Sequence, residues 1–159
     1  MYSGPIGATV ITCGTLSDMS REARLSTRID EDVARRLQEL SARIQTNKSR
    51  LAERYIDEGM RMDEHPGIVF RDGPTGRRAG LAGGPDVWEV IAVIHESGER
   101  GEAAVEHAAG WLDLAPERVR AGVRYYSAYT QEIDRRIERN RELAHTAEAA
   151  WRREQAALA

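Results

Sequence analysis

The stretch ARLSTRIDEDVARRL, from Ala23 to Leu37, changes its hydrophobic period partway along. Its first half alternates as an extended strand does, with one face made of Leu25, Thr27 and Ile29 and the other of Arg24, Ser26 and Arg28. From Val33 onward, apolar residues recur every three or four positions, which is the helical spacing. A strand this short is not stable by itself. The sequence therefore predicts a short strand that needs a partner strand and leads directly into a helix.

Two capped helices are predicted after this strand. Asp30 is a good N-cap, and the acidic residues that follow it suit the positive end of the helix dipole. The first helix is expected to end near Ile44–Gln45, and Asn47 is expected to cap the second. The second helix has an apolar stripe, made of Leu51, Ala52, Tyr55, Ile56 and Met60.

Composition limits the size and class of the protein. The chain has 159 residues and a net charge of -3, with 31% charged and 6% aromatic residues. That length suits one ordinary domain or two small ones, and that composition suits helices with wide solvated faces. Residues 19–62 contain ten Lys and Arg against eight Asp and Glu, whereas residues 63–126 contain seven against eleven. The basic excess therefore lies in the segment with the predicted strand.

The chain is predicted to have four parts. Residues 1–20 are rich in Gly, Ser and Thr and are expected to form a disordered tail, with Met19 as an alternative start. Residues 21–62 hold the strand and the two helices. Residues 63–126 are expected to form a small hairpin, from 68–70 and 77–81, followed by three short helices. Residues 127–159 contain no Pro or Gly and are expected to form one long helix.

Residues 24–62, RLSTRIDEDVARRLQELSARIQTNKSRLAERYIDEGMRM, resemble a ribbon-helix-helix DNA-binding domain of bacterial antitoxins and small repressors. The resemblance implies that two chains pair their strands into an antiparallel ribbon, which enters the major groove. Thr27 departs from the family, which usually has an aliphatic residue there. The implied DNA-binding residues are Arg24, Ser26 and Arg28, which read bases, and Asn47, Lys48 and Ser49, whose helix N-terminus favours a phosphate.

Residues 65–129, from HPGIVFRDGPTGRRAG to APERVRAGVRYYSAY, resemble a small winged-helix-like module of antitoxins that partner PIN-type ribonuclease toxins. The resemblance implies that Pro116–Tyr126 stands at the recognition-helix position, with Arg118, Arg120 and Arg124 available. The net acidity of this segment argues against strong DNA affinity. A dimerisation or toxin-docking role is an equally good interpretation.

Enzyme motifs are absent from the sequence. GPTGRRAG lacks the Gly-Lys-Ser/Thr end of a phosphate loop, and His95-Glu96 lacks the second His of a zinc protease. The four histidines show no metal-ligand spacing, and the single Cys13 cannot form an internal disulfide. We therefore expect a cytoplasmic protein that is not an enzyme, holds no cofactor and does not enter the membrane. Trp88 and Trp111 are predicted to be core residues.

The two resemblances together imply an antitoxin of a type II toxin-antitoxin system, similar to the VapB kind. It would dimerise through the ribbon, bind its own operator, autoregulate its operon and neutralise a PIN-domain ribonuclease toxin. Tyr129, Ile133 and Ile137 are expected to pack on the middle module or on a second chain. Residues 144–159 are expected to be exposed or poorly ordered alone and to become fixed in a toxin groove, with Trp151, Arg152, Arg153 and Leu158 as the predicted toxin-binding residues. The alternative is a stand-alone ribbon-helix-helix repressor whose C-terminal helix only oligomerises.

Overall fold

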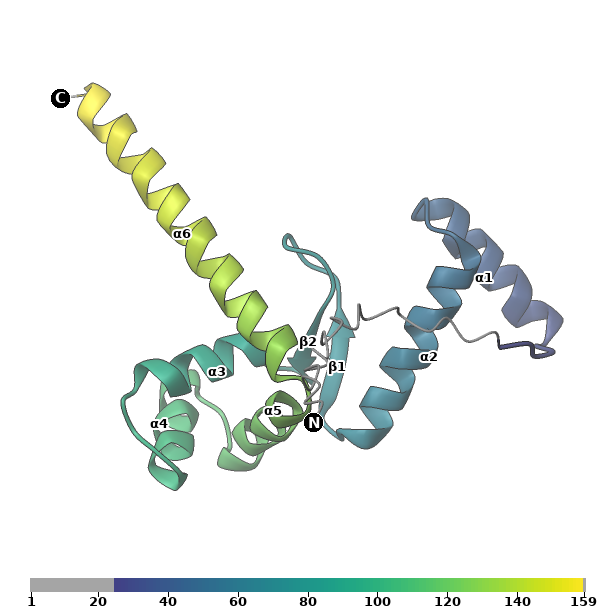
Figure 1. Ribbon diagram of the computed structural model, residues 1–159, viewed down its shortest axis with the longest axis horizontal. Coiled ribbons are helices and arrows are strands. Elements are labelled where there is room, and N and C mark those ends of the chain that lie inside the picture. The colour runs from purple at the N-terminus through teal and green to yellow at the C-terminus, as the bar shows by residue number, and fades with distance from the viewer. Residues whose placement is uncertain (1–24, 159) are drawn as a thin grey trace, which may run out of the picture.

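The computed structural model describes residues 25–158, which are mainly helical with one small antiparallel sheet (Figure 1). This coarse prediction from the sequence is confirmed. The elements in chain order are α1 (Glu31–Arg43), α2 (Lys48–Glu64), β1 (Ile68–Arg71), β2 (Arg78–Leu81), α3 (Val87–Glu96), α4 (Glu102–Leu112), α5 (Pro116–Ala128) and α6 (Thr130–Leu158).

The helices α1 and α2 begin and end where local chemistry favours it. Asp30 Oδ1 accepts a hydrogen bond from Asp32 N at 2.9 Å, and Asn47 Oδ1 accepts one from Ser49 N at 2.8 Å. Both predicted N-caps are therefore present. After α1, Gln45 has a left-handed φ of 52°, and Thr46 N donates to Ser41 O at 3.0 Å, which completes a Schellman motif.

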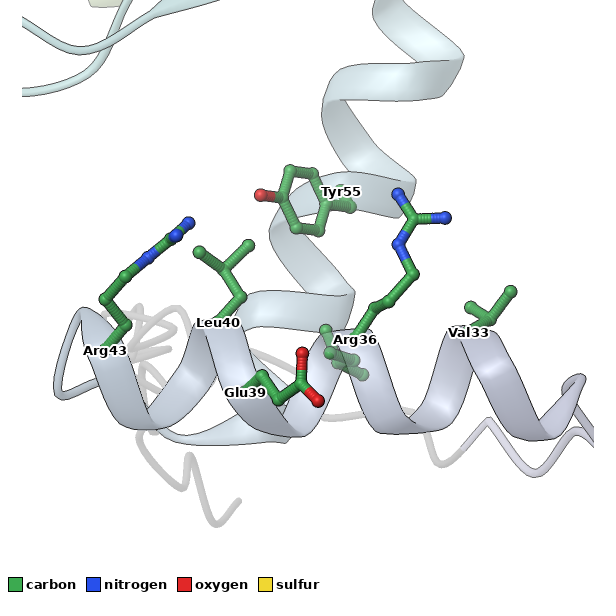
Figure 2. A pocket seen from close by; sticks show the side chains of 7 residues that line it. Val33, Arg36, Glu39, Leu40, Arg43 and Tyr55 are labelled. Carbon is green, nitrogen blue, oxygen red and sulfur yellow. The ribbon is translucent and has the colours of Figure 1, made fainter.

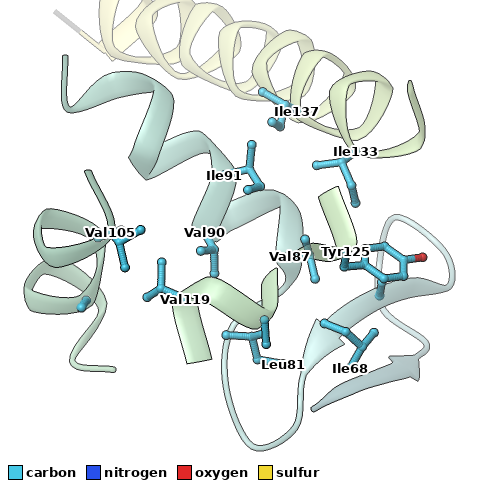
Figure 3. Close-up of a cluster of buried hydrophobic side chains, with 14 residues drawn as sticks. Ile68, Leu81, Val87, Val90, Ile91, Val105, Val119, Tyr125, Ile133 and Ile137 are labelled. Atoms are coloured by element: carbon cyan, nitrogen blue, oxygen red, sulfur yellow. The ribbon is translucent and has the colours of Figure 1, made fainter. Parts of the chain in front are cut away.

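The main hydrophobic core lies in the second half of the chain. β1 and β2 pair antiparallel, with Ile68 opposite Leu81. Their buried side chains pack under α3 and α5, and the start of α6 covers α3 with Ile133 and Ile137 (Figure 3). Tyr125 of α5 is fully buried between these elements. We call residues 65–137, which surround this core, the hairpin-helix module.

Two ion pairs attach the C-terminal half of α2 to the hairpin-helix module. Arg77 Nη2 donates to Glu58 Oε2 at 2.6 Å, although Glu58 is only 6% exposed. Arg61 Nη1 donates to Glu132 Oε2 at 2.7 Å and to the Tyr125 hydroxyl at 3.1 Å. Burial opposes the charge on Arg61, but these hydrogen bonds outweigh it and hold the guanidinium pKa above its usual range. These two ion pairs therefore fix the orientation of α2 relative to the hairpin-helix module.

The long helix α6 leaves the module after its second turn. Ile133 and Ile137 are buried, whereas residues 141–149 and 151–158 are exposed. Arg141 still pairs with Glu96 at 3.5 Å, and beyond that point α6 projects away from the rest of the chain (Figure 1). No helix in the described range is long and apolar enough to cross a membrane.

One of the two tryptophan predictions is wrong. Trp88 packs against the core as expected, but Trp111 is 74% exposed. The reason is that α4 packs against the core through small side chains, among them Ala104, Ala108 and Ala109. Trp111 lies at the edge of this buried face of the helix.

Candidate functional site

The segment predicted to be a strand pairs with no strand among residues 25–158. Residues 25–30 form neither helix nor strand, and Leu25 and Ile29 are 72% and 52% exposed. Ser26 and Arg28 are also exposed, while Arg24 lies outside the described residues. A strand needs the backbone groups of a neighbouring strand to form its hydrogen bonds. The ribbon therefore stays a prediction that requires a second chain.

An open groove of about 510 Å³ runs along α1 beside Tyr55 of α2 and is lined by apolar and charged side chains (Figure 2). Val33 and Leu40 of α1 and Tyr55 of α2 line it, and Val33 and Tyr55 are 49% and 43% exposed. Ile56 and Met60 continue the exposed apolar surface along α2. Side chains of this kind are normally buried, so α1 and α2 have an uncovered apolar face.

The N-terminus of α2 lies beside the unpaired segment. Ile29, Lys48 and Ser49 line a common hollow of about 270 Å³. The first turn of α2 carries no acidic residue, so the positive end of its dipole is not neutralised there. Lys48 and Ser49 are exposed, and the Asn47 side chain is occupied in capping the helix. Of the residues before α1, Ile29 thus lies near Lys48 and Ser49, two of the predicted phosphate-binding residues.

Most arginines of the hairpin-helix module are used internally. Arg71 and Arg78 pair with Asp86, and Arg77 pairs with Glu58. On α5, Arg118 donates to Ala82 O at 2.6 Å, and Arg120 pairs with Glu102 and Glu117. Three arginines are expected at the recognition-helix position. Among the described residues, Arg124 is the one of these whose guanidinium forms no hydrogen bond or ion pair, and it accepts from Ser127 Oγ only through its backbone oxygen. This pattern favours a protein-binding or structural role for the module over DNA binding.

Asp86 organises the hairpin through ion pairs that its position in the sequence does not indicate. Its carboxylate is 4% exposed and accepts hydrogen bonds from Arg71 Nη2 at 2.6 Å, from Trp88 Nε1 at 3.2 Å and from Arg78. Glycine at position 80 leaves room for the Arg71 guanidinium, because a Cβ there would lie 2.8 Å from Nη2. Burial alone would raise the Asp86 pKa, but the two arginines outweigh it and hold that pKa below its usual value.

The predicted toxin-binding residues lie together on the projecting part of α6. Trp151 and Leu158 are 59% and 83% exposed, and their spacing of seven residues places them on one face. Arg152 pairs with Glu148 at 2.6 Å within the same helix, and Arg153 is exposed. The projecting part of α6 is therefore a regular α-helix with an exposed aromatic and aliphatic edge.

The described residues contain no group of His, Cys, Asp or Glu side chains that could hold a metal ion. Comparisons of the chain with protein-family models, with curated proteins and with solved structures found no match.

Proposed function

We propose that this chain is the antitoxin of a type II toxin-antitoxin system. It dimerises through residues 24–29, binds operator DNA with the resulting ribbon, and represses its own operon. It neutralises a PIN-domain ribonuclease toxin with the projecting part of α6. The proposal extends the resemblance seen in the sequence.

One observation carries the proposal most directly. Within the part of the chain that the structure describes, residues 25–30 form no strand, and Leu25 and Ile29 are exposed, as is Val33 of the helix that follows them. A second copy of the same chain would supply the missing backbone hydrogen bonds and cover Leu25, Ile29 and Val33 at once. The arginine and serine side chains of the other strand face would then lie outward, where a major groove can accept them.

We expect the full-length protein to be a dimer whose stability depends on its concentration. Ile29→Glu should produce monomers, because it places a charge in the centre of the expected dimer core. Analytical ultracentrifugation measures this directly. Leu143→Glu is the matched control, since Leu143 is 48% exposed on α6. A monomeric L143E variant together with a dimeric I29E variant would show that α6, and not the ribbon, joins the chains.

A second prediction concerns the operator. Arg28→Ala should cost roughly 1–3 kcal/mol of binding free energy at one base position, as the loss of a bidentate base contact does. Lys48→Ala should weaken binding to all sequences alike. It should also reduce the magnitude of the slope of log affinity against log salt concentration by about one. Titration of operator variants at several salt concentrations measures both effects. Unchanged operator affinity after combined replacement of Arg24, Ser26 and Arg28 by Ala would exclude ribbon readout.

The alternative function, a stand-alone repressor, differs in the role of α6. The exposed edge of α6 would then join copies of the chain and bind no toxin. Co-purification with the product of the adjacent gene separates the two proposals. A stable complex with a small nuclease supports the antitoxin, whereas a homo-oligomer that L143E or Trp151→Ala breaks supports the repressor.

A further inference from the structure

Helix α4 carries an exposed aromatic pair at the end of the molecule opposite α1 (Figure 1). The rings of Trp111 and His107 stack nearly parallel, with an interplanar angle of 7° and a centroid distance of 6.5 Å. Trp111 is 74% exposed, although α4 is well anchored by the buried Ala104 and Ala108. A large uncovered aromatic side chain on an anchored helix is typical of a binding surface.

The exposed side of α4 has three parallel strips, as the helical repeat of 3.6 residues per turn requires. Its centre is formed by two small residues, Ala103 and Gly110, and a side chain built at Gly110 would meet nothing within 4 Å. One edge holds His107 and Trp111. The opposite edge holds Glu102 and Glu106. We call these six residues the α4 outer face.

The charges on this face are one-sided. Glu102 already pairs with Arg120, but Glu106 takes part in no ion pair of the described residues. Asp113 adds a further carboxylate directly after the helix, and α4 itself contains no Lys or Arg. The helix α4 of a second copy would bring no arginine or lysine of its own, the nearby Arg120 is already paired with Glu102 and Glu117, and Arg100 lies before the helix. The face instead suits a partner that supplies a cation of its own.

We propose that the α4 outer face is a docking surface for a basic amphipathic helix of a protein partner. The small central strip lets the partner helix approach closely, because no side chain fills the groove. Its apolar residues cover Trp111 and His107, and its arginines reach Glu106 or stack over the exposed face of the indole. This proposal does not depend on the antitoxin function, because it uses neither the ribbon nor the tail of α6.

The test uses the full-length protein and two defined helical peptides of alanine, leucine and a charged residue. The peptides are identical except that one has arginine where the other has glutamate. NMR of the indole N–H signals reports on Trp88, Trp111 and Trp151 separately. We expect the arginine peptide to shift the Trp111 signal, the glutamate peptide to leave it unchanged, and the response to weaken as salt rises.

Two variants and one control complete the test. Trp111→Ala should abolish binding without loss of helical circular dichroism, because the side chain is exposed. Glu106→Gln should weaken binding about threefold, as expected for an exposed ion pair. Trp151→Ala, which removes the other exposed tryptophan, should leave the binding of the arginine peptide to α4 unchanged. Equal binding of the two peptides, binding that persists in W111A, or no shift of the Trp111 signal would each overturn the proposal.

Discussion

Asp86→Ala should lower the free energy of unfolding by roughly 3–5 kcal/mol, as removal of one partner from a buried ion pair does. The carboxylate is 4% exposed and is shared by Arg71 and Arg78, so its loss leaves two guanidinium groups without an anion. Asp86 is also the N-cap of α3, and Glu89 Oε2 accepts from its backbone N–H at 2.7 Å. The substitution therefore weakens the hairpin and the start of α3 together.

Chemical denaturation followed by circular dichroism measures this loss. Asp86→Asn keeps a side-chain oxygen that can cap α3, but it removes the charge and turns one of the two acceptor oxygens into an amide donor. Asp72→Ala is the matched control, since its carboxylate is 78% exposed and pairs with Arg77 at 3.2 Å. An exposed pair of this kind contributes about 0–1 kcal/mol. Equal losses in D86A and D72A would show that the Asp86 cluster is not central to the module.

The same carboxylate gives the module a defined acid sensitivity. The pKa of Asp86 is lower in the folded chain than its ordinary value of 3.8. A group with a lowered folded pKa contributes its stability fully above the unfolded pKa and loses it as the pH falls through the folded one. We therefore expect wild-type stability to fall below about pH 4 more steeply than that of D86N, which has no carboxylate to protonate.

Deletion of residues 149–159 should abolish toxin neutralisation and leave operator binding nearly unchanged. Of the described residues removed, Ala150 alone is half-buried and the others are exposed, whereas the core contacts of α6 come from Ile133 and Ile137. The module and the α1–α2 pair should therefore fold normally. If this part of α6 binds a toxin groove, the deletion removes all four predicted toxin-binding residues together, namely Trp151, Arg152, Arg153 and Leu158.

Point variants make this prediction specific. Trp151→Ala should weaken toxin binding by about 2 kcal/mol or more, which is the size expected of an interface hot spot. His145→Ala is the control on the same helix, because His145 is exposed and lies on a different face. Inhibition of the toxin's ribonuclease activity, measured beside operator affinity, reports both functions. Full neutralisation by the truncated protein would indicate that the toxin binds to the hairpin-helix module and not to the end of α6.

Local features of the fold could be predicted from the sequence with good accuracy. The caps at Asp30 and Asn47, the hairpin around Gly73 and the Pro116 start of α5 each depend on a few neighbouring residues. Such features follow from backbone rules that a short stretch of sequence contains completely. The antitoxin assignment and the ribbon remain predictions, because both require a second molecule.

The sequence by itself determined the helical character of the chain, its capped boundaries and the basic character of the N-terminal segment. Tertiary structure alone decided which charged groups meet and which apolar groups stay uncovered. Asp86 joins Arg71 and Arg78, which lie 15 and 8 residues before it, because the hairpin folds them onto the start of α3. Trp111 looks like a core residue by its chemistry, yet α4 buries its alanines instead. Burial depends on how whole helices pack, and the residues that set that packing are far apart in the chain.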